Sequence, residues 1–134
     1  PAGRSAGALE LTDHWQSAGA NDRVQLAELG AELNRRICEE HMRAGVTIVD
    51  PASTWIDVDV RLGSDTTIYP GTCLRGATVV GDYCEIGPSA TLIDAEIGDR
   101  CVVPAAWVGK GCVAADTMVR PYTTIGTLMT AHGA

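Results

Sequence analysis

The sequence predicts a mainly β protein, in which one long α-helix precedes a parallel β-helix of triangular section. Bulky aliphatic residues recur every six positions, which fits neither the 3.6-residue period of an α-helix nor the two-residue period of a strand. Compact residues recur four positions after the aliphatic ones. A chain that turns a corner every six residues, with three short strands per coil, accounts for both patterns. The aliphatic positions are Ile56, Leu62, Ile68, Leu74, Val80, Ile86 and Leu92, and the compact ones are Val60, Thr66, Thr72, Thr78, Cys84 and Ala90.

The six-residue rhythm becomes irregular after Leu92. Three steps shrink to five residues, and we place them at positions 92 to 97, 103 to 108 and 114 to 119. Trp107 falls where a small inward residue belongs, and an indole does not fit that position of a regular coil. We therefore expect a distorted corner at residues 104–107.

Residues 22–44 are predicted to form one helix. Asn21 or Asp22 is suited to the N-cap, and Gly45 stands where a C′ residue is expected. An apolar stripe on this helix needs cover, either from the β-helix of the same chain or from copies of the same helix in an oligomer. The stripe consists of Leu26, Leu29, Leu33 and Ile37.

These patterns divide the chain into three parts. Residues 1–20 are rich in Ala, Gly and Ser, and we expect a loosely ordered leader there. Residues 21–45 form the helix, and residues 46–134 form the β-helix domain.

Composition limits the range of partners. The formal charge of −7 argues against a nucleic acid or an anionic membrane, because both attract dense Lys and Arg. No apolar run of about 18 residues exists, so no membrane span is expected. The low aromatic content of 4% suits a narrow interior filled by aliphatic and small residues.

The five cysteines do not read as a disulfide framework, because their number is odd and their spacing follows the repeat. Cys84, Cys101 and Cys112 are predicted to occupy small inward positions, with Cys84 and Cys101 stacked on successive coils. Buried, reduced thiols are the expected state, and they indicate a reducing cytoplasm. Clustered metal ligands are absent from the sequence, and we expect neither a metal nor a cofactor.

Residues 21–99 closely resemble one bacterial family, the bifunctional N-acetylglucosamine-1-phosphate uridyltransferase and glucosamine-1-phosphate acetyltransferase, in its actinobacterial form. The resemblance implies a left-handed hexapeptide-repeat β-helix and a homotrimer. It also identifies the helix as the linker that follows the nucleotidyltransferase domain in that family. The matching segments are 21–29, 32–36, 45–51, 54–57 and 69–72.

The same resemblance implies that most of the family's catalytic parts are missing. Nothing in residues 1–20 matches the glycine-rich nucleotide loop, and the chain ends 13 residues after Pro121, before the family's late coils. Only Arg120 matches a substrate contact, an arginine on the sugar phosphate. Tyr122 replaces the glycine that follows the family's Arg-Pro pair. An alternative interpretation of Arg120 is a solvated side chain on an outer strand.

Other polar residues are weaker candidates. His132 is a candidate general base only if the tail folds against a neighbouring subunit. Asp57 and Asp59 are predicted to alternate on one strand and to face the same side, as ordinary surface carboxylates. A new site would require several polar side chains that face one point after residue 100, where the chain departs from the family. Its candidate members are Arg100, Lys110, Asp116, Arg120, Tyr122 and His132.

Two functions are compatible with these observations. The first is a repurposed small enzyme of the hexapeptide-repeat transferase superfamily, which acts on an anionic small molecule in an inter-subunit groove without either parental activity. Arg120 and Tyr122 are its predicted substrate-binding residues. The second is a non-catalytic structural or regulatory trimer, which in one form assembles with the intact bifunctional enzyme. The first is slightly favoured, because the divergence is concentrated in one region while the scaffold is kept.

Overall fold

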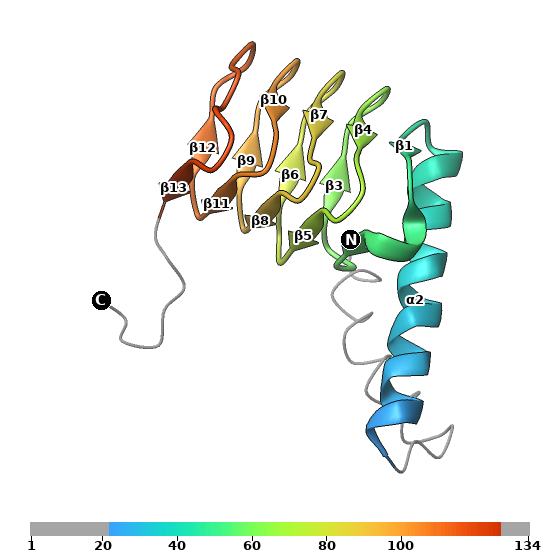
Figure 1. Cartoon of the computed structure of the whole chain (residues 1–134). Helices are drawn as coiled ribbons and strands as arrows, with labels where there is room; N and C mark the ends of the chain where they lie inside the picture. Colours follow the sequence, from blue (N-terminus) through green and yellow to red (C-terminus); the bar gives the residue numbers. More distant parts are fainter. Residues whose placement is uncertain (1–21, 127–134) are drawn as a thin grey trace.

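The structure is a computed structural model that describes residues 22–126, and it consists of a helix followed by a stack of parallel coils. Figure 1 shows α2 (Arg23–Arg43) at one end of the stack and β13 (Thr124–Gly126) at the other. A single 3-10 turn, η1 (Pro51–Ser53), interrupts the first coil. The remaining strands are β1 (Thr47–Ile48), β2 (Trp55–Ile56), β3 (Arg61–Leu62), β4 (Thr67–Ile68), β5 (Cys73–Arg75), β6 (Val79–Val80), β7 (Glu85–Ile86), β8 (Thr91–Ile93), β9 (Glu96–Ile97), β10 (Val102–Val103), β11 (Trp107–Gly109) and β12 (Cys112–Val113).

Three parallel sheets form the sides of the stack. Their strand orders are β1-β4-β7-β10, β13-β11-β8-β5-β2 and β12-β9-β6-β3, and we name them sheets A, B and C in that order. Up to β12, every third strand along the chain therefore joins the same sheet, so each coil contributes one strand to each side. β13 follows β11 in sheet B, because the sheet A position between them is a single bridge from Met118 to Val102. The predicted left-handed parallel β-helix is confirmed.

The six-residue aliphatic positions fill the interior, as predicted. Ile68, Ile86 and Leu92 are fully buried, and each lies in register with its counterpart on the next coil. The compact positions stand beside them at the corners, where Thr66, Thr72, Thr78, Cys84 and Ala90 are all buried. Removing the aliphatic columns from water is the main stabilising contribution, at about 25 cal/mol per Å² of apolar surface buried.

The corners depend on backbone conformations that side chains usually avoid. Among residues 22–126, nine residues other than glycine have positive φ, between 38° and 65°. Each of the nine donates its backbone N–H to a carbonyl of the preceding coil, over 2.8 to 3.2 Å. The left-handed conformation costs about 1–2 kcal/mol per residue, and these bonds offset it. The nine are Asp65, Tyr83, Ser89, Asp94, Arg100, Ala105, Lys110, Asp116 and Tyr122.

The distortion predicted at residues 104–107 is a shortened corner, and Trp107 does not occupy the small inward position that the spacing assigned to it. Trp107 pairs with Thr91 and Thr124 on the outer surface of sheet B, while Ala106, which is 4% exposed, takes the small inward position. The corner between β10 and β11 is one residue shorter than the corner between β7 and β8, because Val103 and Ala106 are one position closer than Ile86 and Ala90. The shortened corner, and not an inward indole, is what disturbs the rhythm there.

The last five-residue step was also misplaced. Val113 is buried and Ala114 is exposed, so the contraction lies between Val108 and Val113 and not at 114 to 119. One residue is missing from the corner between β11 and β12, where Lys110 supplies the positive φ. The following step, from Val113 to Val119, is again six residues long.

The cysteine prediction holds for two of three inward sites. Cys84 and Cys101 are buried and lie on successive coils, and each thiol donates to a backbone carbonyl 3.0 Å away. Thr66 occupies the same column and donates its hydroxyl in the same way, to Gly81 at 2.7 Å. Cys112 is exposed instead, and its thiol lies 3.5 Å from the Glu96 carboxylate, which raises the pKa of Cys112.

The helix caps lie at the predicted residues, and α2 is one residue shorter at each end than the predicted range of 22–44. The Asp22 carboxylate accepts the N–H of Gln25 at 2.9 Å, and Gly45, with φ of 101°, follows the C-cap residue Ala44. The buried face of α2 differs from the predicted stripe. Of that stripe only Ile37 is buried, and the face against the β-helix is completed by Gly30, Asn34, Cys38 and His41.

Asn34 joins α2 to the first coil. Its carboxamide is 7% exposed, donates to the carbonyl of Thr54 at 2.7 Å and accepts the N–H of Ile56 at 2.9 Å. Both groups, one directly before β2 and one within it, point away from the next strand of sheet B. The side-chain amide thus replaces the peptide group that a preceding coil would have supplied.

Neither the predicted leader, residues 1–20, nor the tail beyond Gly126 lies within the described residues. Across residues 22–126, α2 is the only α-helix and is too polar to span a membrane. The same part of the chain holds no group of three side chains suited to a metal ion.

Replacing Asn34 by Leu tests the amide joint. We expect Asn34→Leu to lower the free energy of unfolding by about 2–4 kcal/mol, because two buried backbone groups of β2 lose their partners. Urea denaturation measures the change, and Glu28→Leu, on an exposed site of the same helix, is the control. If Asn34→Leu is no more destabilising than Glu28→Leu, the amide does not close the first coil.

Candidate functional site

Arg120 and Tyr122 lie on one turn, at the corner that connects sheets A and B. Pro121 stands between them, and Thr123 closes the turn by donating its N–H to the Arg120 carbonyl at 3.3 Å. Proline followed by a residue with positive φ, here Tyr122 at 65°, is the pattern of a type II turn. The hydroxyl of Thr123 reinforces the turn with a second bond to the same carbonyl, at 2.6 Å.

Both side chains of this turn are open to solvent. Tyr122 is 89% exposed, and Met118, two positions before Arg120, is 71% exposed. Over residues 22–126 the Arg120 guanidinium has neither an ion pair nor a hydrogen bond. The turn therefore presents a free cation and an aromatic ring, but a single copy of the chain does not enclose them.

The other candidates after residue 100 do not join this turn. Arg100 and Asp116 form a two-pronged ion pair at the corner between sheets C and A, with distances of 2.6 and 3.0 Å. Arg100 lowers the pKa of Asp116. Lys110 lies at the third corner, between β11 and β12. The three corners point in different directions, so the candidates do not converge within one chain.

The remaining histidine candidate is outside the structure's description. His132 follows residue 126, and its proposed role as a base stays a prediction. His41 is the only histidine in residues 22–126, and it is 7% exposed on the buried face of α2. It does not face the turn, since α2 lies at the opposite end of the stack (Figure 1).

Several acidic residues stabilise the fold instead of forming a site. Asp57 and Asp59 do not alternate on a strand as predicted, because the chain turns a corner directly after β2. Asp57 accepts bonds from the Trp55 indole at 2.8 Å and from the Gly76 N–H at 2.9 Å. Asp82, Asp94 and Asp99 likewise accept backbone N–H groups from the preceding coil, at 2.8 to 2.9 Å.

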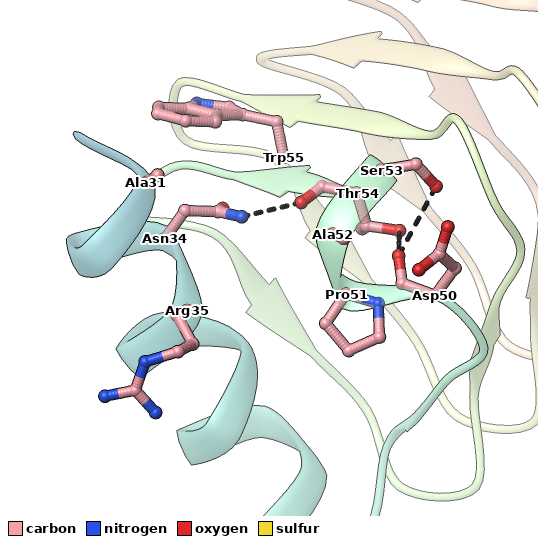
Figure 2. Close-up of a pocket in the computed structure, with 9 residues that line it drawn as sticks. All are labelled: Ala31, Asn34, Arg35, Asp50, Pro51, Ala52, Ser53, Thr54 and Trp55. Atoms are coloured by element: carbon pink, nitrogen blue, oxygen red, sulfur yellow. Dashed lines mark hydrogen bonds between the residues drawn. The ribbon is translucent and has the colours of Figure 1, made fainter. Parts of the chain in front are cut away.

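A cleft of about 670 Å³ lies between α2 and η1, far from Arg120. Figure 2 shows Ala31 and Asn34 on its helix side, Pro51 and Ala52 on the opposite side, and Trp55 over one end. The sequence interpretation missed it, since only the packing angle of α2 on the first coil creates the space. No pattern of the sequence indicated this space.

Most polar groups of this cleft are already bonded within the chain. Arg35 pairs with Glu32 at 2.7 Å and also with Glu39, and the hydrogen bonds of Arg35 and Arg36 to Glu32 lower the pKa of Glu32 to about 2. The Ser53 hydroxyl accepts the N–H of Gly71 at 3.1 Å. The cleft is thus a joint between the helix and the first coil, with few groups left for a ligand.

The architecture defines the class of fold. A triangular stack of parallel coils built on a six-residue repeat is the fold of the hexapeptide-repeat transferases. A serine acetyltransferase from Neisseria gonorrhoeae, solved in complex with serine, has this fold, with a TM-score of 0.53 and 16% identity over 72% of this chain and 53% of that one. At this identity the likeness concerns the fold alone.

Sequence comparison identifies the relatives more closely. The chain is 53% identical over 130 residues to the bifunctional protein GlmU of Mycolicibacterium gilvum, which covers 92% of this chain and 26% of that protein. It is 50% identical over 133 residues to the bifunctional protein GlmU of Mycobacterium marinum, which covers 98% and 27%. The chain matches no protein-family model.

The chain is a homologue of one segment of the bifunctional protein GlmU, and the predicted resemblance to the actinobacterial form is confirmed. It spans only about a quarter of the length of these relatives, 26–27%. The hexapeptide-repeat fold and the homology are properties of this chain, whereas the activities of the whole relatives are not established for it.

Proposed function

We propose that the chain is a small enzyme of the hexapeptide-repeat transferase superfamily that acts on an anionic small molecule. The site is a groove between the subunits of a homotrimer, at the turn that carries Arg120 and Tyr122. The supporting observation is the exposed Arg120 guanidinium, which has no acidic partner within residues 22–126, whereas Arg100 on the next corner is fully paired with Asp116.

The chemistry of the turn favours an anion. A guanidinium offers a planar fork of donors that matches phosphate or carboxylate, and Tyr122 adds an aromatic wall and a hydroxyl. The chain carries a formal charge of −7, so an approaching anion is repelled except near an uncompensated cation. Because one copy leaves Tyr122 89% exposed, a second subunit is needed to enclose the ligand.

The chemistry proposed here is not that of the parental family. Residues 22–126 contain one histidine, His41, which is buried at the far end of the stack from the turn, so they offer no histidine base beside Arg120. We expect neither uridyl transfer nor acetyl-coenzyme A-dependent acetylation of glucosamine-1-phosphate. Product assays against a no-protein control measure both, and either product, with host enzyme excluded, contradicts the proposal.

Arg120→Ala tests the site directly. A thermal-shift screen with sugar phosphates, nucleotide sugars and coenzyme A first identifies an anion that raises the melting temperature. Arg120→Ala is then expected to abolish that rise, because the guanidinium supplies the charge-assisted bonds. The melting temperature without ligand should stay within about 2 °C of the original, since Arg120 is exposed and unpaired.

The matched control is Arg61→Ala, which removes the same charge from an exposed arginine on the outer surface of sheet C. It should leave the ligand effect unchanged. Equal losses in both variants would indicate that only the net charge matters. An undiminished ligand effect in Arg120→Ala would show that the ligand binds elsewhere.

A second function is a non-catalytic structural or regulatory trimer that assembles with a full-length homologue. Identity of 50–53% over nearly the whole chain supports it, because surfaces shared at this level allow mixed assemblies. This function needs no ligand at Arg120. A small anion that raises the melting temperature favours the enzyme. A full-length homologue that forms a mixed species with the chain favours the regulatory trimer.

Assembly is measured by sedimentation velocity of the chain alone and mixed with a full-length homologue. We expect the mass of three chains at micromolar concentration, because the exposed turn is enclosed only by a neighbouring copy. A monomer under these conditions removes the groove and with it the proposed enzyme. A mixed species containing both proteins favours the regulatory function.

A further inference from the structure

The outer face of sheet A carries a second polar group besides Arg120, a pair formed by Tyr69 and Glu85. The Tyr69 hydroxyl donates to the Glu85 carboxylate at 3.1 Å, and across residues 22–126 that carboxylate has no cation beside it. The bond to Glu85 raises the pKa of Tyr69, so the hydroxyl keeps its proton at neutral pH. Because Glu85 is exposed and a carboxylate accepts several donors, it can accept further bonds from outside the chain.

Strand register places this pair on the same face as Arg120. Figure 1 shows β4, β7 and β10 following one another along one side of the stack. Glu85 of β7 pairs with Val102 of β10, and Val102 forms a bridge to Met118. Met118 and Arg120 stand on either side of the buried Val119, so both point outward, as Glu85 does.

The surface between Glu85 and Arg120 is uncharged. Two strand spacings and two residues along the strand direction put their Cα atoms about 12 Å apart. The positions between them are Gly87, which has no side chain, and the half-buried Val102 and Pro104. Because Glu85 and Arg120 are both exposed and long, an extended small molecule can lie over this surface and reach both charged ends.

From these observations we propose that the outer face of sheet A binds an extended zwitterion, with its anionic group on Arg120 and its ammonium group on Glu85. The inference rests on the proposed anion site at Arg120 and adds the other half of its ligand. Tyr69 holds the carboxylate in place, and the ammonium group donates charge-assisted bonds to it. A plain anion would leave Glu85 uncompensated on a chain of charge −7, whereas a zwitterion neutralises both side chains.

The test compares two probes, 6-aminohexyl phosphate and hexyl phosphate, which differ by one ammonium group. The first spans about 10 Å from nitrogen to phosphorus when extended, at ordinary single-bond lengths. We expect the full chain to bind it about fivefold more tightly than hexyl phosphate in isothermal titration calorimetry, because one more ion pair forms. Glu85→Gln should remove this preference and leave the affinity for hexyl phosphate unchanged, whereas Arg120→Ala should abolish the binding of both.

The matched control is Glu96→Gln, which removes the same charge from an exposed carboxylate on sheet C and should keep the preference. If hexyl phosphate binds through Arg120 but the amine adds no affinity, the inference fails while the anion site stands. A preference that survives Glu85→Gln, or that Glu96→Gln removes equally, has the same meaning. Binding of hexyl phosphate that survives Arg120→Ala overturns the anion site itself, and no binding of 6-aminohexyl phosphate at millimolar concentration overturns the inference.

Discussion

The stack depends on one backbone arrangement, the left-handed corner residue that bonds to the coil before it. Strand amides point forward, as when Thr67 donates to Cys84, whereas corner amides such as that of Tyr83 point backward, here to Ser64. Each coil is therefore held from both directions. Nine side-chain-bearing residues adopt this costly conformation within residues 22–126, and they do so because an unbonded amide at a tight corner would cost more. Because the corner side chains point into solvent, this arrangement also determines which residues form the outer surface.

The corner arrangement also explains where the charge lies. Carboxylates such as Asp82 and Asp99 stand at the corners and accept a second backbone N–H from the neighbouring coil. An acidic composition thus contributes to the fold directly, and much of the charge of −7 is not free for catalysis. Against this background a cation without a partner is informative. Arg120 occupies the corner equivalent to those of other coils but has no carboxylate beside it, which is why a ligand is proposed there and not at Arg100.

The two ends of a β-helix present a different problem from its sides, because a terminal coil has no neighbour. At sheet B, the side-chain amide of Asn34 takes the place of the missing peptide group. At sheet A, the last turn of α2 covers the first strand, because Val46 donates its N–H to the carbonyl of His41 at 3.0 Å. Sheet C alone keeps an open first strand, beside the exposed start of the helix stripe.

The sequence by itself determined the class of fold, the inward columns up to Leu92 and the caps of the helix, because strict six-residue spacing and capping residues act locally. It did not determine the register afterwards. A missing residue can be absorbed at any corner, and a shift of one position turns every following side chain to the opposite face. Trp107 and Cys112 were misassigned for that reason, and only pairing with Thr91 and Glu96 fixed their direction. Arg120 and Tyr122 were found from the sequence, but their separation from Lys110 and Arg100 required the three corners of the folded coil. Tertiary structure likewise decided which face of α2 contacts the first coil. The hydrogen bonds of Asn34 to that coil place a polar residue, and not the whole leucine stripe, against it.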